Sequence, residues 1–129
     1  MRFFETIGSA ILVAYDDRPV LTTDAWVDGD AYFGSWGLDY EIPAAQMHAI
    51  RDAQYHWFSH GHPDHTNIAS LPMLTKGEFL LSDHYGNRIK RELEPQATGS
   101  KFFPIESGSS YQKAYAFTRS PTKIKIHCC

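Results

Sequence analysis

Three histidines and one aspartate lie within one six-residue segment of this chain, His60-Gly61-His62-Pro63-Asp64-His65. Imidazole nitrogens and carboxylate oxygens are donors that Zn²⁺, Fe²⁺ and Mn²⁺ take from proteins. His60 and His62, separated by one residue, can point to the same side and chelate one ion. Asp64 and His65 then fall on the other side of the turn, within reach of a second ion about 3.5–4 Å away. Residues 60–65, called the histidine loop below, therefore predict a metal site.

The chemistry that such a site supplies is hydrolysis. A metal ion lowers the pKa of its bound water toward about 7, so that hydroxide becomes available at neutral pH. This hydroxide can attack an ester, lactone, amide or phosphoester. Asp64 is expected to be a metal ligand and is also the candidate residue for taking a proton. We therefore expect a metal-dependent hydrolase with a small-molecule substrate.

An apolar strand predicted over residues 55–59 leads directly into the histidine loop. Ligand sites in sheets flanked by helices lie outside the strand ends. Gly61 and Pro63 are turn formers, which suits a loop with a fixed backbone. The sequence thus places the metal site at the end of a buried strand.

The segments around this strand alternate between strand and helix patterns. Residues 9–15 and 20–23 predict a β-hairpin, residues 24–37 a long loop, and Pro43 the start of a helix through Arg51. Further on, Asn67 can cap a short helix through Leu74, although Pro72 must lie near its start or shorten it. A strand is predicted over 78–82, followed by a helix that is capped by Ser82 or Asp83 and ended by Pro95, with Tyr85, Ile89 and Leu93 on one face. This order indicates an α/β fold.

The chain changes character near Gly99. Residues 1–100 carry a net charge of −7 and residues 101–129 one of +4, within an overall −3. Residues 102–105 and 123–126 have strand patterns, whereas 107–121 have no helical or strand period. The basic residues of the tail are scattered, so we do not expect nucleic-acid binding. We predict a domain over 1–99 and a basic, irregular tail over 100–129.

Length and composition set further bounds. With 129 residues the chain forms one domain at most, and no apolar run reaches the ~18 residues of a membrane span. The N-terminus lacks the pattern of a secretory signal. The only cysteines, Cys128 and Cys129, are adjacent and cannot join distant parts of a fold. We expect a cytoplasmic protein.

The segment from Ser59 to His65 resembles the signature of the metallo-β-lactamase-fold metallohydrolase superfamily, and residues 22–26 resemble the strand-end segment that precedes it in lactonase-like and phosphodiesterase-like branches. The resemblance covers about residues 5–95. It implies an αββα sandwich with two zinc sites, in which iron or manganese is also possible. By position, His60 and His62 would be ligands of the first metal, and Asp64 and His65 of the second.

The superfamily normally adds a third histidine, a bridging aspartate and a last histidine from a C-terminal half that this sequence does not show. The resemblance therefore implies the N-terminal half of a sandwich, and we expect a truncated chain with weak metal binding and little hydrolysis on its own. The alternatives are a catalytically inactive fragment or interaction module with an incomplete metal site, and a site completed by self-association or by a complementary half.

Other candidate residues are weaker. Asp24 follows a predicted strand and is either support for a ligand histidine or a turn residue. His84 is a possible ligand but is favoured as a helix-start residue, and His127 with Cys128 and Cys129 cannot all face one ion comfortably. Aromatic residues crowd the loop before the first helix and cover the core edge or form the wall of a substrate cleft: Trp26, Tyr32, Phe33, Trp36 and Tyr40.

Overall fold

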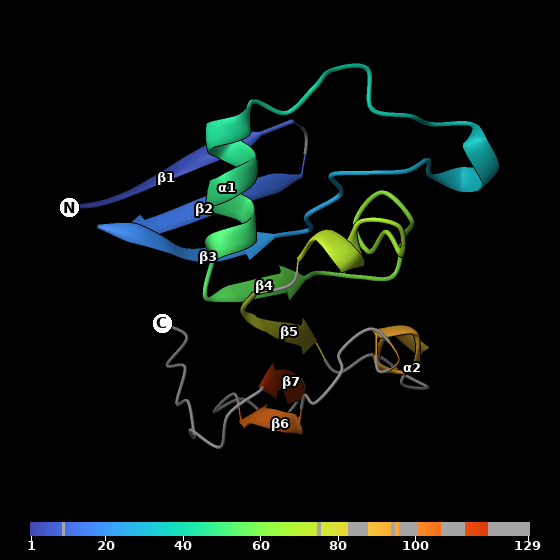
Figure 1. Cartoon of the computed structure of the whole chain (residues 1–129). Helices are drawn as coiled ribbons and strands as arrows, with labels where there is room; N and C mark the ends of the chain where they lie inside the picture. The colour runs from blue at the N-terminus through green and yellow to red at the C-terminus, as the bar shows by residue number, and fades with distance from the viewer. Residues whose placement is uncertain are drawn as a thin grey trace.

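The computed structural model describes residues 1–8, 10–74, 76–82, 88–93, 95, 101–106 and 113–118. Its strands form one seven-stranded mixed sheet in the order β1-β2-β3-β4-β5-β7-β6 (Figure 1). The strands are β1 (Arg2–Ile7), β2 (Ile11–Asp16), β3 (Arg18–Thr23), β4 (Tyr55–Phe58), β5 (Glu78–Ser82), β6 (Lys101–Glu106) and β7 (Lys113–Thr118). The α-helices are α1 (Ala44–Asp52) and α2 (Arg88–Leu93), with short 3-10 turns η1 (Tyr32–Gly34) and η2 (Leu71–Met73).

The centre of the sheet is parallel, and this arrangement positions the histidine loop. β3, β4 and β5 pair in parallel, so their carboxyl ends meet at one edge of the sheet. Asp24 directly follows β3, and the histidine loop starts two residues after β4. Two chemistry-bearing segments that are 36 residues apart in sequence (24 and 60) therefore lie at the same edge, where open α/β sheets bind ligands.

One face of the sheet carries the hydrophobic core. Val13 and Phe58 point into it and are buried, together with Ile50 of α1 and Ile89 and Leu93 of α2. Figure 1 shows α1 lying across β1 to β3. Both described α-helices thus contribute to the core on the same face.

The opposite face of the sheet is also rich in apolar side chains. Because side chains alternate along a strand, Ala14, Leu21 and Tyr55 share a row with Phe4, and Trp57 lies in the next row. Phe4 is 71% exposed and the other four are half-buried. A sheet with two apolar faces is typical of a fold with a further layer.

Several predictions are confirmed. The hairpin forms from β2 and β3, which pair antiparallel around Asp17. The helix opens directly after Pro43, which occupies its N-cap position, and the strands expected over 55–59 and 78–82 are β4 and β5. In the final helix, Ile89 and Leu93 are buried, as their spacing predicts. Tyr85 and the candidate cap Asp83 belong to residues 83–87, which lie outside the described part of the chain.

Three predictions about elements are wrong or incomplete. The helix through Leu74 is instead a series of turns ending in η2, because Pro72 cannot continue an α-helix and the Asn67 side chain bonds the backbone N–H groups of Ala69 and Ser70. The strand β1 was not anticipated. β7 falls within 107–121, where no strand period was found, and pairs with β5. Residues 102–105 lie in β6, while 123–126 are not described.

In the part of the chain that the structure describes, no helix has the length and apolar character needed to cross a membrane.

Candidate metal centre

The histidine loop is held in place by side chains that follow it in sequence. The hydroxyl of Thr66 donates to the carbonyl of His60 at 2.7 Å, and the amide of Asn67 donates to the carbonyls of Pro63 and Asp30, both at 3.1 Å. Thr66 and Asn67 are buried. Since these bonds fix the backbone at the start and in the middle of the loop, its side chains occupy defined positions.

The long loop after β3 is attached to the same region through Ser70. Its fully buried hydroxyl accepts hydrogen bonds from the backbone N–H groups of Val27 and Asp28, at 2.9 and 3.0 Å, and donates to the carbonyl of Asp28. On the other side, Gly61 lies against α2, where an added Cβ would come within 3.1 Å of Ile89. The histidine loop is thus packed between α2 and the 24–40 segment.

Asp24 organises the base of the site. Its backbone has a positive φ of 41°, which is uncommon for a residue other than glycine. This conformation accompanies two hydrogen bonds to its carboxylate, from the Ser59 backbone N–H at 2.7 Å and from the Ser59 hydroxyl at 2.8 Å. Asp24 therefore fixes the residue that precedes the histidine loop.

The same chain of hydrogen bonds selects one tautomer of His60. The Ser59 hydroxyl gives its proton to Asp24, so the Nδ1–H of His60 must be the donor in the 2.8 Å contact with Ser59 Oγ. The neutral ring then presents the lone pair of Nε2. Burial, together with the neighbouring His65 and His62, lowers the pKa of His60 and so favours this neutral form. A neutral imidazole with a fixed tautomer is a typical metal ligand.

The remaining donors of the loop lie beside His60. His60 Nε2 and His62 Nδ1 are 2.9 Å apart, and the rings of His60 and His65 have centroids 4.1 Å apart. His65 Nε2 is 3.4 Å from Asp64 Oδ2, and His65 Nδ1 is 3.1 Å from Asp24 Oδ2. The structure therefore brings together all four residues predicted from the sequence, with Asp24 as a fifth.

These donors bond to one another rather than converge on a common point. In the described ranges, no group of three or more His, Cys, Asp or Glu side chains is arranged so that it could hold a metal ion. The buried Nδ1 of His65 has no partner with hydrogen-bond geometry, although the Asp24 carboxylate is close to it. The loop thus brings imidazole and carboxylate groups of the types that bind divalent metals close together, without the converging arrangement that a bound ion requires.

Tyr32 supports Asp64 from the long loop. Its hydroxyl donates to Asp64 Oδ1 at 2.7 Å. Partial burial raises the pKa of Asp64, but the Tyr32 hydrogen bond, a backbone hydrogen bond and the nearby His65 and His62 outweigh it and leave the pKa below its usual value. The same hydrogen bond raises the pKa of Tyr32. Asp64 is thus stabilised as the carboxylate that ligation requires.

Sequence reasoning missed Ser59 and Ser70 as contributors to the site, and it considered Tyr32 only as an aromatic residue of the core edge or cleft wall, not as a partner of Asp64. Ser59 could have been predicted, because a hydroxyl directly before the candidate ligand His60 is within reach of its ring. The contacts of Tyr32 with Asp64 and of Ser70 with Val27 could not be predicted, since they span 32 and 43 residues of sequence. His84 and the group His127, Cys128 and Cys129 lie outside the described residues.

Comparisons with known proteins extend over a limited part of the chain. No family model matches it, and no solved structure matches it. It is similar to a cytidine monophosphate-N-acetylneuraminic acid hydroxylase of Asterias rubens, with 33% identity over 57 residues. The match covers 44% of this chain and 9% of the length of that relative.

Proposed function

We propose that this protein is a metal-dependent hydrolase of the metallo-β-lactamase-fold superfamily, whose histidine loop supplies part of a two-metal site. His60 and His62 would hold one ion, and Asp64 and His65 the other. The observation that carries the proposal is the hydrogen-bonded chain from Asp24 through Ser59 to His60, at the carboxyl end of β4. This chain leaves a lone pair on an imidazole that is surrounded by three further metal-binding side chains.

The metal would be Zn²⁺, with Fe²⁺ or Mn²⁺ as alternatives, because imidazole and carboxylate ligands suit all three. When bound, it would acidify a water molecule that attacks an ester, lactone, amide or phosphoester of a small-molecule substrate. The residues of this chain would position the ligands: Ser59 and Asp24 orient His60, and Tyr32 holds Asp64. Asp64 is also placed to take a proton.

The αββα sandwich belongs to the same proposal. Its support is the second apolar face of the sheet, with Phe4, Leu21 and Trp57, which a second sheet would cover. This second layer would come from a complementary half or from self-association. We place the protein in the cytoplasm, since adjacent cysteines suit a reducing compartment.

A second candidate is a catalytically inactive interaction module that keeps the loop. The observation that favours it is the direct 2.9 Å contact between His60 and His62, which satisfies both nitrogens without an ion. The two functions predict different metal contents and can therefore be separated by measurement.

The test is elemental analysis of the protein after dialysis against Zn²⁺, in parallel with His62→Ala and with His48→Ala as control. His48 is exposed on α1, so its removal takes away an imidazole far from the loop. We expect bound zinc that is lost in His62→Ala and kept in His48→Ala. Absence of zinc from the unaltered chain, or equal zinc in both variants, would refute the proposal in favour of the inactive module.

A further inference from the structure

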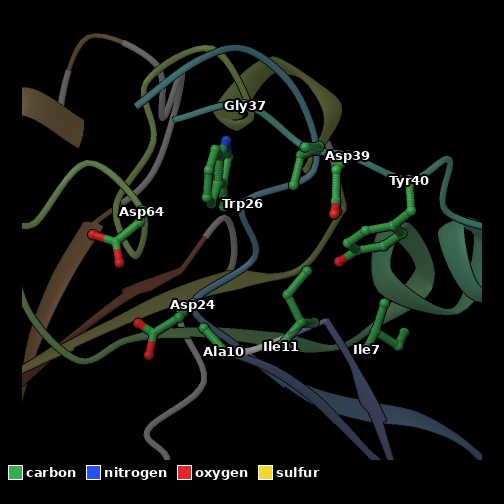
Figure 2. Close-up of a pocket in the computed structure, with 10 residues that line it drawn as sticks. Ile7, Ala10, Ile11, Asp24, Trp26, Gly37, Asp39, Tyr40 and Asp64 are labelled. Carbon is green, nitrogen blue, oxygen red and sulfur yellow. The ribbon is translucent and has the colours of Figure 1, made fainter. Parts of the chain in front are cut away.

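A pocket of about 310 Å³ lies directly beside the histidine loop. Three segments line it: the β1–β2 hairpin, the stretch from β3 to α1, and the histidine loop itself (Figure 2). Asp24 and Asp64 belong both to this pocket and to the candidate metal centre. The volume is at the lower end of the range of small-molecule pockets, which bury most of their ligand.

The walls of the pocket are apolar and aromatic. Ile7 and Ile11 form its floor and are buried, and Trp26 and Tyr40 stand on opposite sides in Figure 2. The indole N–H of Trp26 donates to the carbonyl of Gly29 at 2.9 Å, so the ring offers the pocket its apolar surface. Tyr40 packs against Gly8, where an added Cβ would lie 2.0 Å from the tyrosine oxygen. A flat, apolar ligand body fits between these rings.

The charges that line the pocket all have one sign. Its charged lining residues are Asp24, Asp39 and Asp64, and no lysine or arginine is among the residues that line it. The Asp24 carboxylate is engaged by Ser59, and Asp64 by Tyr32. Asp39 is exposed and has no hydrogen bond or ion pair with another described residue, and Figure 2 shows its carboxylate pointing into the space between Trp26 and Tyr40.

From this geometry we infer that the pocket binds a small aromatic amine, with the ring between Trp26 and Tyr40 and the ammonium group at Asp39. Carboxylate and aromatic faces both attract an organic cation, whereas they repel an anion. The same argument disfavours phosphate-bearing ligands, including a cytidine monophosphate derivative. The binding of this amine does not depend on the proposed function. Its role as the substrate of the neighbouring metal centre rests on the proposed function.

The test is a binding titration of the metal-free protein, followed by NMR chemical shifts, with three probes of similar shape: phenethylammonium, 2-phenylethanol and 3-phenylpropionate. We expect the amine to bind at least ten times more tightly than the carboxylate, with the alcohol between them. The shifts should include the indole N–H of Trp26. Absence of amine binding, or equal affinity for the amine and the carboxylate, would overturn the inference.

Two variants and a control locate the effect. Asp39→Asn should weaken amine binding about tenfold and leave alcohol binding unchanged, while Tyr40→Leu should weaken both. Asp52→Asn removes the same charge at the opposite edge of the sheet and should change neither affinity. Equal losses in Asp39→Asn and Asp52→Asn would mean that only overall charge matters, and would also overturn the inference. Because no metal is present, failure here is distinguishable from failure of the proposed function.

Discussion

His56 and His60 are four residues apart on the same stretch of chain, yet their surroundings differ completely. His56 is fully buried within β4, with Nδ1 at 2.7 Å from the Thr22 hydroxyl and Nε2 at 2.7 Å from the carbonyl of Lys76. His60, just beyond the strand, is partly exposed and uses one nitrogen on Ser59 while the other faces His62.

The difference shows that partners, rather than residue type, decide what a histidine does. A carbonyl can only accept, so His56 must carry its proton on Nε2, and Thr22 donates to Nδ1. Both nitrogens are then satisfied within the fold, and the ring has a structural role. His60 has one nitrogen anchored on Ser59 and the other facing His62, an arrangement that suits the ligand role proposed for it.

The largest expected effect concerns the structural histidine. His56→Ala leaves a cavity and removes the partner of the Thr22 hydroxyl and the Lys76 carbonyl, so it should lower the free energy of unfolding by about 3–4 kcal/mol. Chemical denaturation measures this loss. His48→Ala, at an exposed position of α1, is the matched control and should change stability by less than about 0.5 kcal/mol. Equal losses of unfolding free energy in the two variants would contradict the structural role of His56.

The free energy of unfolding should also depend on pH through His56, by a similar amount. Burial lowers its pKa from 6.5 to about 4, against the opposing hydrogen bond to Lys76, so between these values the unfolded chain binds the extra proton. The stabilisation is therefore complete above pH 6.5 and is lost as the pH falls toward 4, by about 3 kcal/mol at 1.36 kcal/mol per pH unit. The stability difference between the unaltered protein and His56→Ala should shrink accordingly. A difference that stays constant from pH 7 to pH 4 would contradict this account.

A smaller effect should follow from removing the anchor of His60. Ser59→Ala breaks the link from Asp24 to the His60 ring and should weaken Zn²⁺ binding about 10–100-fold, as loss of such hydrogen bonds does in metal sites. Calorimetric titration measures the affinity. Ser35→Ala, at an exposed serine of the long loop, is the control and should bind zinc normally. Unchanged affinity in Ser59→Ala would mean that the anchor does not orient His60.

The sequence predicted the local features of the site better than its long-range contacts. The four histidine-loop residues, the strand before them and the position of Asp24 at the end of β3 all follow from motif spacing and apolar runs. The support from Tyr32 and Ser70 was not predictable, because it depends on how the 24–40 loop folds back. His56 lies within the strand predicted over residues 55–59, but its two hydrogen-bond partners could not be predicted, since both are distant in sequence.

The predictions of helices and strands also succeeded where local sequence decides the structure and failed where other contacts decide it. β4 and β5 were found because buried parallel strands are continuous apolar runs. The helix expected through Leu74 failed where local side-chain bonds of Asn67 and the restriction at Pro72 outweighed an apolar helical spacing. The sequence of β1 has no clear alternation of apolar and polar residues, so it was not predicted as a strand. Its extended conformation depends on its pairing with β2.

The most direct test of the account is a Zn²⁺ titration in which long-range ¹H–¹⁵N NMR spectra follow each imidazole. Before zinc is added, His56 should show the Nε2–H tautomer and His60 the Nδ1–H tautomer. On titration, the signals of His60, His62 and His65 should shift or broaden first, with those of His56 and His48 unchanged. Zinc-induced changes that reach all histidines equally, or spare the histidine loop, would contradict the assignment of a metal centre there.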